Sequence, residues 1–393
     1  MRTGLSKVAG LVGLWGICGV AAALPWEVLT DGNTPWQSLQ RIRQVHDLPG
    51  ASDLLAQAAA IVGDEALSCA NRRQIPRFDG TGRWQDALSV LAGDAGQYRV
   101  IMLNESHDRS RHRAFLEQMI VMLHEQGVRA LAAETLSPQV AGSVSDGQVR
   151  TTSGVYTRDP VFANAVRMAL ALGWTLVPYE PELSAVEADP RAAREQGQAE
   201  ALADWLQAHP EERLLVYVGG SHLDKRPEAG WMAARLSRLT GEAPLSIRQG
   251  ATACPGDDVD HWPRLPGRDG VALVDRDREA TLEADRVIIH PPVSSHSGRP
   301  GWLARLPGRM AARICLPDTM MDGLLRVFPP AIASDPTLVA IDQLPIEAGQ
   351  REAVVLVAAA GRWEVVLERA DGNWQRLGGI TVPVGKAACL LPE

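Results

Sequence analysis

The order of hydrophobic and polar residues repeats itself four times between residues 97 and 225. Each repeat has a short apolar run, followed by a stretch whose apolar residues recur every three or four positions, the spacing of a helix face. Such alternation is typical of βα units, which build a parallel sheet with helices on its faces. The pattern therefore predicts an α/β core domain over residues 97–330. The four mainly apolar runs cover residues 98–103, 128–133, 174–178 and 214–218.

Different patterns flank this core. Residues 24–96 carry stretches of helix-forming residues, whereas residues 335–393 contain the short runs rich in β-branched residues that favour strands. We expect a helical N-terminal segment and a small C-terminal antiparallel β appendage, in which residues 353–368 form a hairpin around Ala360-Gly361. Shorter apolar runs at 271–274 and 287–289 could extend the parallel sheet. Helices are expected at residues 51–62, 84–91, 109–126, 161–172, 190–209 and 231–239, and a further turn at 371–373.

The first 23 residues have the three parts of a secretory signal peptide. Arg2 and Lys7 give a positive start, an apolar stretch of about 13 residues follows, and small residues end at Ala23. We predict cleavage after Ala23 and a periplasmic or secreted mature protein without a stable membrane span. Lipidation at Cys18 is the less favoured alternative, because the bulky Ile17 stands where a small residue precedes a lipidated cysteine.

In an exported protein the four remaining cysteines can pair. Cys69, Cys254, Cys315 and Cys389 allow two disulfides in three possible pairings. Their wide spacing contains no CxxC pair, which argues against a zinc–cysteine cluster. Four buried free thiols is the alternative.

Charge and common motifs narrow the function. The formal net charge of −8, without a dense Lys/Arg cluster, argues against a nucleic acid as partner. The chain contains no GxSxG elbow, no HExxH, no P-loop and no GxGxxG after a predicted strand. We therefore expect a small-molecule or peptide substrate and no nucleic-acid partner.

Three of the four apolar runs lead to residues suited to acid–base or metal chemistry. The first is followed by Glu105 and His107, the second by Glu134, and the fourth by two glycines and then His222. The carboxyl ends of parallel strands face one edge of a sheet, where ligands of open α/β folds bind. We therefore expect these four side chains to lie close together.

This His–Glu–His set has two chemical interpretations. His107, Glu134 and His222 could hold a divalent metal ion that keeps an open position for water. Without a metal, one histidine could take a proton from water while the carboxylates orient that water. His107 lies near the start of a predicted helix, and the positive end of the helix dipole favours the neutral imidazole that both interpretations need.

Four further residues are candidates for the same site. Arg194, in the helix before the fourth apolar run, could bind a substrate carboxylate or an oxyanion, or hold Glu134 in place. Asp108 follows the first run, and Tyr179 and Glu180 follow the third. We expect these three side chains to line the substrate pocket.

Together, these residues resemble the superfamily that unites erythromycin esterase-like hydrolases, ChaN-like haem-binding lipoproteins and Tiki/TraB-type metalloproteases. Those families share a strand followed by G-E-x-H or G-x-x-H, a Glu after the next strand, a helical Arg and a second G-x-x-H. Asn104 stands where the superfamily has Gly, and because Asn can adopt a left-handed backbone, we expect the turn to survive. The counterparts within residues 98–225 are Glu105 and His107, Glu134, Arg194, and Gly219 with His222.

The resemblance implies three alternative functions. An exported hydrolase would cleave an ester, lactone or peptide bond at the His–Glu–His site. A ChaN-like protein would bind haem, with Tyr179 or a histidine as axial ligand of the iron. A degenerate member would keep only the fold, as an exported scaffold whose C-terminal β segment makes the contacts. The hydrolase is the leading hypothesis.

Overall fold

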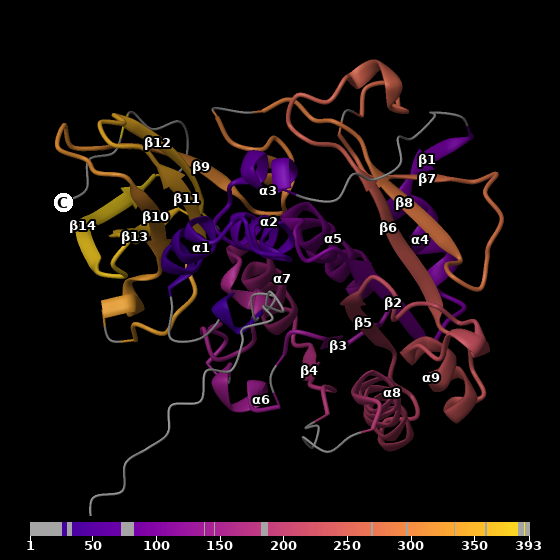
Figure 1. Cartoon of the computed structure of the whole chain (residues 1–393). Helices are drawn as coiled ribbons and strands as arrows, with labels where there is room; N and C mark the ends of the chain where they lie inside the picture. Colours follow the sequence, from indigo (N-terminus) through magenta and orange to yellow (C-terminus); the bar gives the residue numbers. More distant parts are fainter. Residues whose placement is uncertain are drawn as a thin grey trace, which may run out of the picture.

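An eight-stranded, mostly parallel sheet lies at the centre of the α/β core that the sequence predicts (Figure 1). Its strands are β1 (Trp84–Asp86), β2 (Val100–Glu105), β3 (Ala130–Ala133), β4 (Thr175–Val177), β5 (Leu214–Gly219), β6 (Leu245–Thr252), β7 (Leu273–Asp275) and β8 (Arg286–His290). They lie in the order β1-β7-β8-β6-β2-β5-β3-β4, with β7 antiparallel to both of its neighbours. The runs at 271–274 and 287–289 therefore extend this sheet as β7 and β8.

The structure is a computed structural model that describes part of the chain. The predicted signal peptide lies outside the described residues. The described residues are 26–29, 34–71, 82–136, 138–144, 146–181, 188–268, 270–295, 298–333, 335–357, 360–383 and 389.

Helices cover both faces of the sheet. They are α4 (Ala87–Ala95), α5 (Ser110–Glu125), α6 (Val140–Ser143), α7 (Pro160–Ala171), α8 (Pro190–Ala208) and α9 (Met232–Thr240). Because successive strand residues point to opposite faces, Ile101 and Leu103 of β2 pack with α4, α5 and α7, whereas Val100 and Met102 pack with α8 and α9. The helix expected over residues 84–91 loses its first residues to β1. None of the described helices is both long and apolar enough to cross a membrane.

The strand order brings three strand ends together at one edge. β5 lies between β2 and β3, although it follows both of them in the sequence. The register pairs Glu105 of β2 with Gly219 of β5, and Ala133 of β3 with Tyr217 of β5. The segments that leave these three strands therefore start side by side.

The C-terminal β unit contains more of the chain than expected. Its strands are β9 (Met310–Cys315), β10 (Gly323–Phe328), β11 (Asp342–Ile346), β12 (Glu352–Val357), β13 (Gly361–Glu368) and β14 (Trp374–Val382). One sheet has the order β11-β10-β13-β14, and β9 pairs with β12 in a second sheet. We expected this unit to begin at residue 335, but β9 and β10 already belong to it, because Ile314 and Leu325 are buried in its core.

The expected hairpin around Ala360-Gly361 is wrong. β12 pairs with β9, whereas β13 pairs with β10 and β14, so the two strands belong to different sheets. Both strands have the inward apolar residues of a hairpin, but Val355 and Val365 enter the shared core from opposite sheets. The turn at residues 371–373 does join a hairpin, between β13 and β14.

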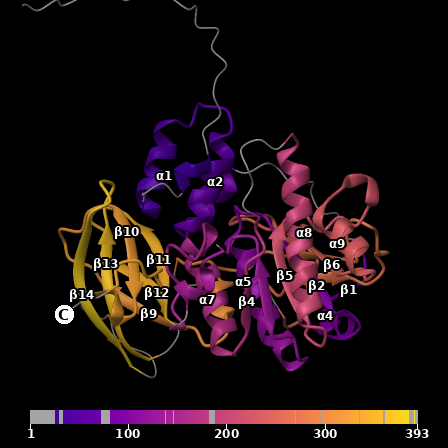
Figure 2. The same ribbon diagram turned by 90° about the horizontal axis from the view of Figure 1, so that it is seen from below.

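The N-terminal helices pack against the C-terminal β unit. They are α1 (Pro35–Gln44), α2 (Ala51–Ile61) and α3 (Glu65–Asn71). Leu39 and Leu55 share an apolar cluster with Leu324 of β10, and the backbone N–H of Trp36 donates a hydrogen bond to Glu368 Oε1 at 2.7 Å. Figure 2 shows α1 and α2 at the top of the view, above the place where the C-terminal strands and the helices of the α/β core meet.

Both disulfides that the cysteine count allows are present. Cys69 in α3 is bonded to Cys254, which follows β6, and Cys315 at the end of β9 is bonded to Cys389. The sequence separations are 185 and 74 residues. The first bond therefore ties the N-terminal helices to the α/β core, and the second closes the C-terminal β unit.

Replacing Cys69 and Cys254 together with serine should lower the free energy of unfolding by about 2–4 kcal/mol, because the bond restricts a long loop of the unfolded chain. Urea denaturation of the oxidised proteins measures this change. The Cys315→Ser/Cys389→Ser pair is the matched comparison, with a loss smaller by about 1 kcal/mol, because its loop is shorter. Equal stability of wild type and the first variant would contradict the role assigned to this bond.

Candidate functional site

The ends of β2, β3 and β5 meet above Gly219, the last residue of β5. A Cβ atom placed on Gly219 would lie 3.0 Å from Glu134 Oε2 and 3.4 Å from His107 Nε2. Side chains from the two neighbouring strand ends therefore converge over this one glycine. The expectation that His107 and Glu134 lie close together agrees with this geometry.

His107 is held through its Nδ1 atom. It lies in the turn between β2 and α5, and Nδ1 is 2.6 Å from Glu105 Oε1. Since Glu105 is an anion, the short contact favours the tautomer with a proton on Nδ1 and a lone pair on Nε2. The imidazole is also stacked on the ring of Tyr156, with 4.2 Å between ring centroids and 11° between planes. Nε2 is thus the ring nitrogen directed towards the space above Gly219.

Glu105 is itself fixed by Arg113. The Nε and Nη2 atoms of Arg113 donate to the two carboxylate oxygens of Glu105 at 3.0 and 3.2 Å, and Nη2 also donates to the backbone carbonyl of His107. Burial by itself would raise the pKa of Glu105, but Arg113 and His107 outweigh it and lower this pKa to about 2. Glu105 therefore stays ionised at any pH at which the protein is expected to work.

Glu134 is the second carboxylate of the site. Its Oε2 atom accepts the backbone N–H of Gly219 at 2.5 Å, and its Oε1 atom accepts Arg194 Nη2 at 2.5 Å. Burial would raise the pKa of Glu134, but His222 and Arg194 outweigh burial and hold it well below its usual range. Of the three roles considered for Arg194, its contact with Glu134 corresponds to holding that carboxylate in place.

His222 lies between two carboxylates. Its Nδ1 atom is 3.0 Å from Glu195 Oε2, and its Nε2 atom is 3.6 Å from Glu134 Oε1. Burial would lower the pKa of His222, but its contacts with Glu134 and Glu195 raise it to about 9. These contacts favour the protonated ring at neutral pH, whereas the roles of second base or metal ligand predicted for His222 need the neutral ring.

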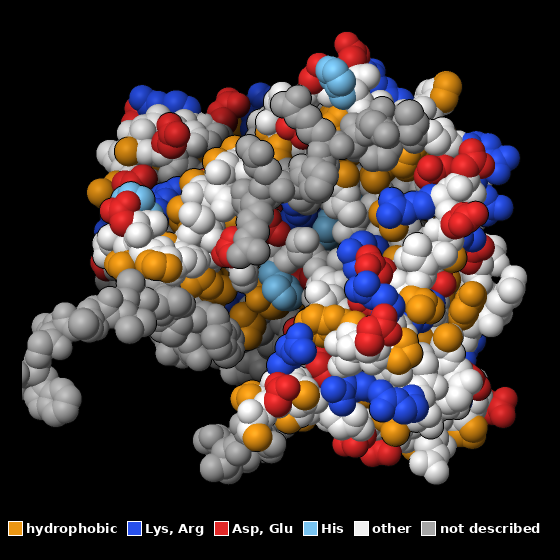
Figure 3. Space-filling view, turned by 45° about the vertical axis from the view of Figure 1, so that its right-hand side comes forward, with side chains coloured by type: hydrophobic (Ala, Val, Ile, Leu, Met, Phe, Trp, Pro, Cys, Tyr) orange, Lys and Arg blue, Asp and Glu red, His pale blue; other side chains and the backbone are white. Residues whose placement is uncertain are grey.

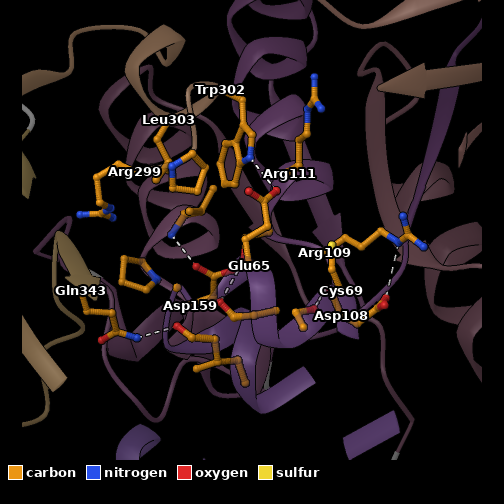
Figure 4. A pocket seen from close by; sticks show the side chains of 18 of the residues that line it. Glu65, Cys69, Asp108, Arg109, Arg111, Asp159, Arg299, Trp302, Leu303 and Gln343 are labelled. Atoms are coloured by element: carbon orange, nitrogen blue, oxygen red, sulfur yellow. Dashed lines mark hydrogen bonds and ion pairs between the residues drawn. The ribbon is translucent and has the colours of Figure 1, made fainter. Parts of the chain in front are cut away.

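The remaining predicted residues lie in three different places. Glu180 accepts hydrogen bonds from Arg194 and Gln198, and so supports Arg194. Tyr179 is buried, with its hydroxyl 3.4 Å from the backbone carbonyl of Tyr217. Asp108 lines a separate cavity of about 40 Å³ (Figure 4).

Asn104 is held in the sheet by hydrogen bonds to Gln249, and does not form the turn that we expected. It is not in a turn, because β2 continues through Glu105. Its side-chain Oδ1 accepts the backbone N–H of Gln249, and its backbone carbonyl accepts Gln249 Nε2 at 2.6 Å. Asn104 thus joins β2 to β6, and the turn that a glycine would favour begins after it.

Sequence reasoning missed three residues that shape the site: Arg113, Glu195 and Tyr156. Arg113 precedes the buried Leu116 by three positions, and Glu195 precedes the buried Ala199 by four, so both lie on inward helix faces. A charged residue at such a position signals a buried ion pair. No comparable signal marks Tyr156, which lies in a short 3-10 helix.

The metal and haem interpretations gain no support from the geometry. Among the described residues, no group of three or more His, Cys, Asp and Glu side chains is arranged to hold a metal ion. The ring nitrogens of His222 face carboxylates. Tyr179, the candidate axial ligand of haem, is 2% exposed.

The site opens to the surface on one side. The side chains of His107 and Arg194 are 28% and 32% exposed, whereas that of Glu105 is 3% exposed. Figure 3 shows histidine side chains in a hollow of the molecular surface, next to acidic and basic side chains. His107 and Arg194 therefore reach the surface in part, while Glu105, which holds His107, stays buried.

The chain matches no protein-family model, and no curated protein matches its sequence. Among solved structures it is similar to the type III effector HopBA1, with 14% identity over 54% of this chain and 98% of that one, and a TM-score of 0.37. It is also similar to the RRSP effector domain of a MARTX toxin from Vibrio vulnificus, with 16% identity over 51% of this chain and 35% of that one, and a TM-score of 0.28.

A third match, described as bacterial protein toxins, has 14% identity over 42% of this chain and 36% of that one, with a TM-score of 0.34. The chain thus spans about a third of the two toxin chains.

The raised pKa of His222 predicts a pH-dependent stability. The protonated ring is favoured in the folded state, so its contribution is fully present below about pH 6.5, the ordinary pKa of histidine, and is lost as the pH rises through about 9. The difference in unfolding free energy between wild type and His222→Gln should shrink by about 2–3 kcal/mol over this window. Urea denaturation from pH 6 to 10 measures it, and a constant difference would refute the assignment.

Proposed function

We propose that this chain is a hydrolase in which His107 activates a water molecule above Gly219. The observation that carries the proposal is the convergence of His107 Nε2 and Glu134 Oε2 on the same small space, at 3.4 and 3.0 Å from a Cβ position on Gly219. Nδ1 of His107 is occupied by Glu105, so the opposite ring nitrogen is available as a base. The similarity of these residues to the esterase-like superfamily supports the same assignment.

In this proposal His107 is the general base. Its Nε2 atom takes a proton from water as the water oxygen attacks the carbonyl carbon of the substrate, and the imidazolium is stabilised by Glu105. His107 then returns the proton to the leaving group as the tetrahedral intermediate breaks down. Glu134 accepts a hydrogen bond from the attacking water and so orients it.

In this proposal Arg194 and His222 supply the positive charge of the site. Both are beside Glu134, and together they keep that carboxylate ionised. The same two charges favour a negative charge that develops on the substrate oxygen during attack. The substrate is an ester, a lactone or a peptide, since each has a carbonyl carbon that water can attack.

Export is a second part of the proposal. The sequence predicts cleavage after Ala23, and the two disulfides support an oxidising compartment such as the periplasm or the extracellular space. The haem-binding alternative has no comparable support, because Tyr179 is buried with its hydroxyl against a backbone carbonyl. The superfamily itself stays a proposal that rests on the motif residues.

Replacing His107 with glutamine should reduce kcat/KM by about 100- to 10,000-fold, because general base catalysis contributes about this much. A panel of activated esters, lactones and peptides provides the measurement. His46→Gln is the matched control, since the His46 side chain is 65% exposed and pairs with the adjacent Asp47; its activity should equal that of wild type.

Hydrolysis that is equally fast in His107→Gln and wild type would refute the role of His107. A chelator distinguishes the two chemical forms of the site. Activity that survives chelation and still falls in His107→Gln supports the metal-free base, whereas loss on chelation with recovery on adding a divalent ion supports the metal form.

Replacing Gly219 with alanine should abolish hydrolysis while leaving the fold intact, because the new methyl group would occupy the space between His107 and Glu134. Gly220→Ala is the matched control: its Cβ would be 4.0 Å from its nearest neighbour, Asn104 Nδ2. Turnover and thermal unfolding of both variants check this prediction. Equal activity in the two variants would mean that the reaction takes place elsewhere.

A further inference from the structure

Arg113, which holds Glu105, is bound to a second carboxylate that the proposed reaction does not use. Its Nη1 atom donates to Asp159 Oδ2 at 2.8 Å, while Nε and Nη2 donate to Glu105. The Arg113 side chain is 0% exposed. A buried guanidinium is stable only when its charge and its N–H groups are matched, so both carboxylates determine where Arg113 lies.

Asp159 is held rigidly in turn. Its Oδ2 atom also accepts Ser110 Oγ at 2.7 Å, and its Oδ1 atom accepts the backbone N–H of Val161 at 2.9 Å. Ser110 is the first residue of α5, the helix that carries Arg113, and Asp159 caps α7. Asp159 therefore fixes the start of α7 to α5 at the level of Arg113. Figure 4 shows it in the wall of the cavity that Asp108 also lines.

The charges of this group act on His107. Two carboxylates, Glu105 and Asp159, share one cation, Arg113, so the group has one net negative charge beside the imidazole. That charge favours the imidazolium that forms when His107 takes a proton from water. Arg113 also donates to the backbone carbonyl of His107, so a shift of Arg113 would move the base itself.

We propose that Asp159 is a positioning residue of the site: through Arg113 it fixes Glu105, and through Glu105 it holds His107 in the orientation that leaves Nε2 above Gly219. The four groups form one continuous chain of contacts, Asp159–Arg113–Glu105–His107, with distances of 2.8, 3.0 and 2.6 Å. Its effect on catalysis rests on the proposed function, whereas its effect on the His107 hydrogen bond does not.

The alternative is that Asp159 only caps a helix, and the chain contains a natural comparison for this. Asp189 is followed by Pro190 at the start of α8, as Asp159 is followed by Pro160 at the start of α7. The Asp189 side chain also accepts a backbone N–H of its helix, that of Ala192 at 3.0 Å. Asp189 is exposed, whereas Asp159 is buried and bound to Arg113.

The first test compares Asp159→Asn with Asp189→Asn. Asparagine can still cap each helix, but at position 159 it removes one negative charge from the buried group. We expect kcat to fall about 10- to 100-fold in Asp159→Asn, as for other outer partners of a reacting group, with KM unchanged, and to stay at the wild-type level in Asp189→Asn.

The second test needs no substrate. The proton on Nδ1 of His107, in its 2.6 Å contact with Glu105, should give a far-downfield proton NMR signal that is absent in His107→Gln. In Asp159→Asn this signal should move upfield and exchange faster with water, whereas Asp189→Asn should keep it unchanged. Where Asp159→Asn does not fold, Ser110→Ala, which removes one donor to Asp159, should give the same change to a smaller extent.

The outcomes separate the two proposals. Wild-type protein without activity on any substrate of the panel overturns the proposed hydrolase, and the NMR signal still decides the positioning role. An unchanged signal and an unchanged kcat in Asp159→Asn, or the same changes in Asp189→Asn, overturn the positioning role while the hydrolase stands.

Discussion

The buried guanidinium of Arg113 is the constraint around which the α/β part is organised. A cation without access to water must be surrounded by carboxylates and carbonyls, and here these come from β2, from the turn after it and from the start of α7. The end of the central strand, the candidate base and two helices therefore share one interaction. Tyr156 and Phe162 complete the enclosure, with their ring centroids 5.2 and 5.9 Å from the guanidinium carbon.

A second charged group lies on the other side of Gly219. It consists of Glu134, Glu180 and Glu195 with Arg194 and His222, and its members come from four different segments. The two groups have different roles. Arg113 and its carboxylates hold His107 in place, whereas in the second group two cations surround the carboxylate of Glu134. The absence of a side chain at Gly219 keeps free the space between Glu134 of the second group and His107, which a Cβ atom would enter.

Much of the fold could be predicted from the sequence, because periodicity reports which face of an element is buried. The parallel core, its strand ends and the convergence of His107 with Glu134 follow from this rule. The pairing of distant strands does not follow from periodicity. β12 and β13 look like a hairpin in the sequence, but they belong to two sheets that share one core. For the same reason, local sequence cannot distinguish Asp159 from Asp189, since only the arrival of Arg113 from another helix makes them different.

The contact between α1 and β13 has a consequence for how the chain is made. The Trp36 backbone and the Glu368 side chain are hydrogen-bonded although 332 residues separate them, and Leu324 completes the apolar cluster of the first helices. During synthesis, the first helices are therefore made long before the strands that cover them. Their apolar side chains stay without their final cover until nearly the whole chain has been translated, so the first and last segments complete their folding together.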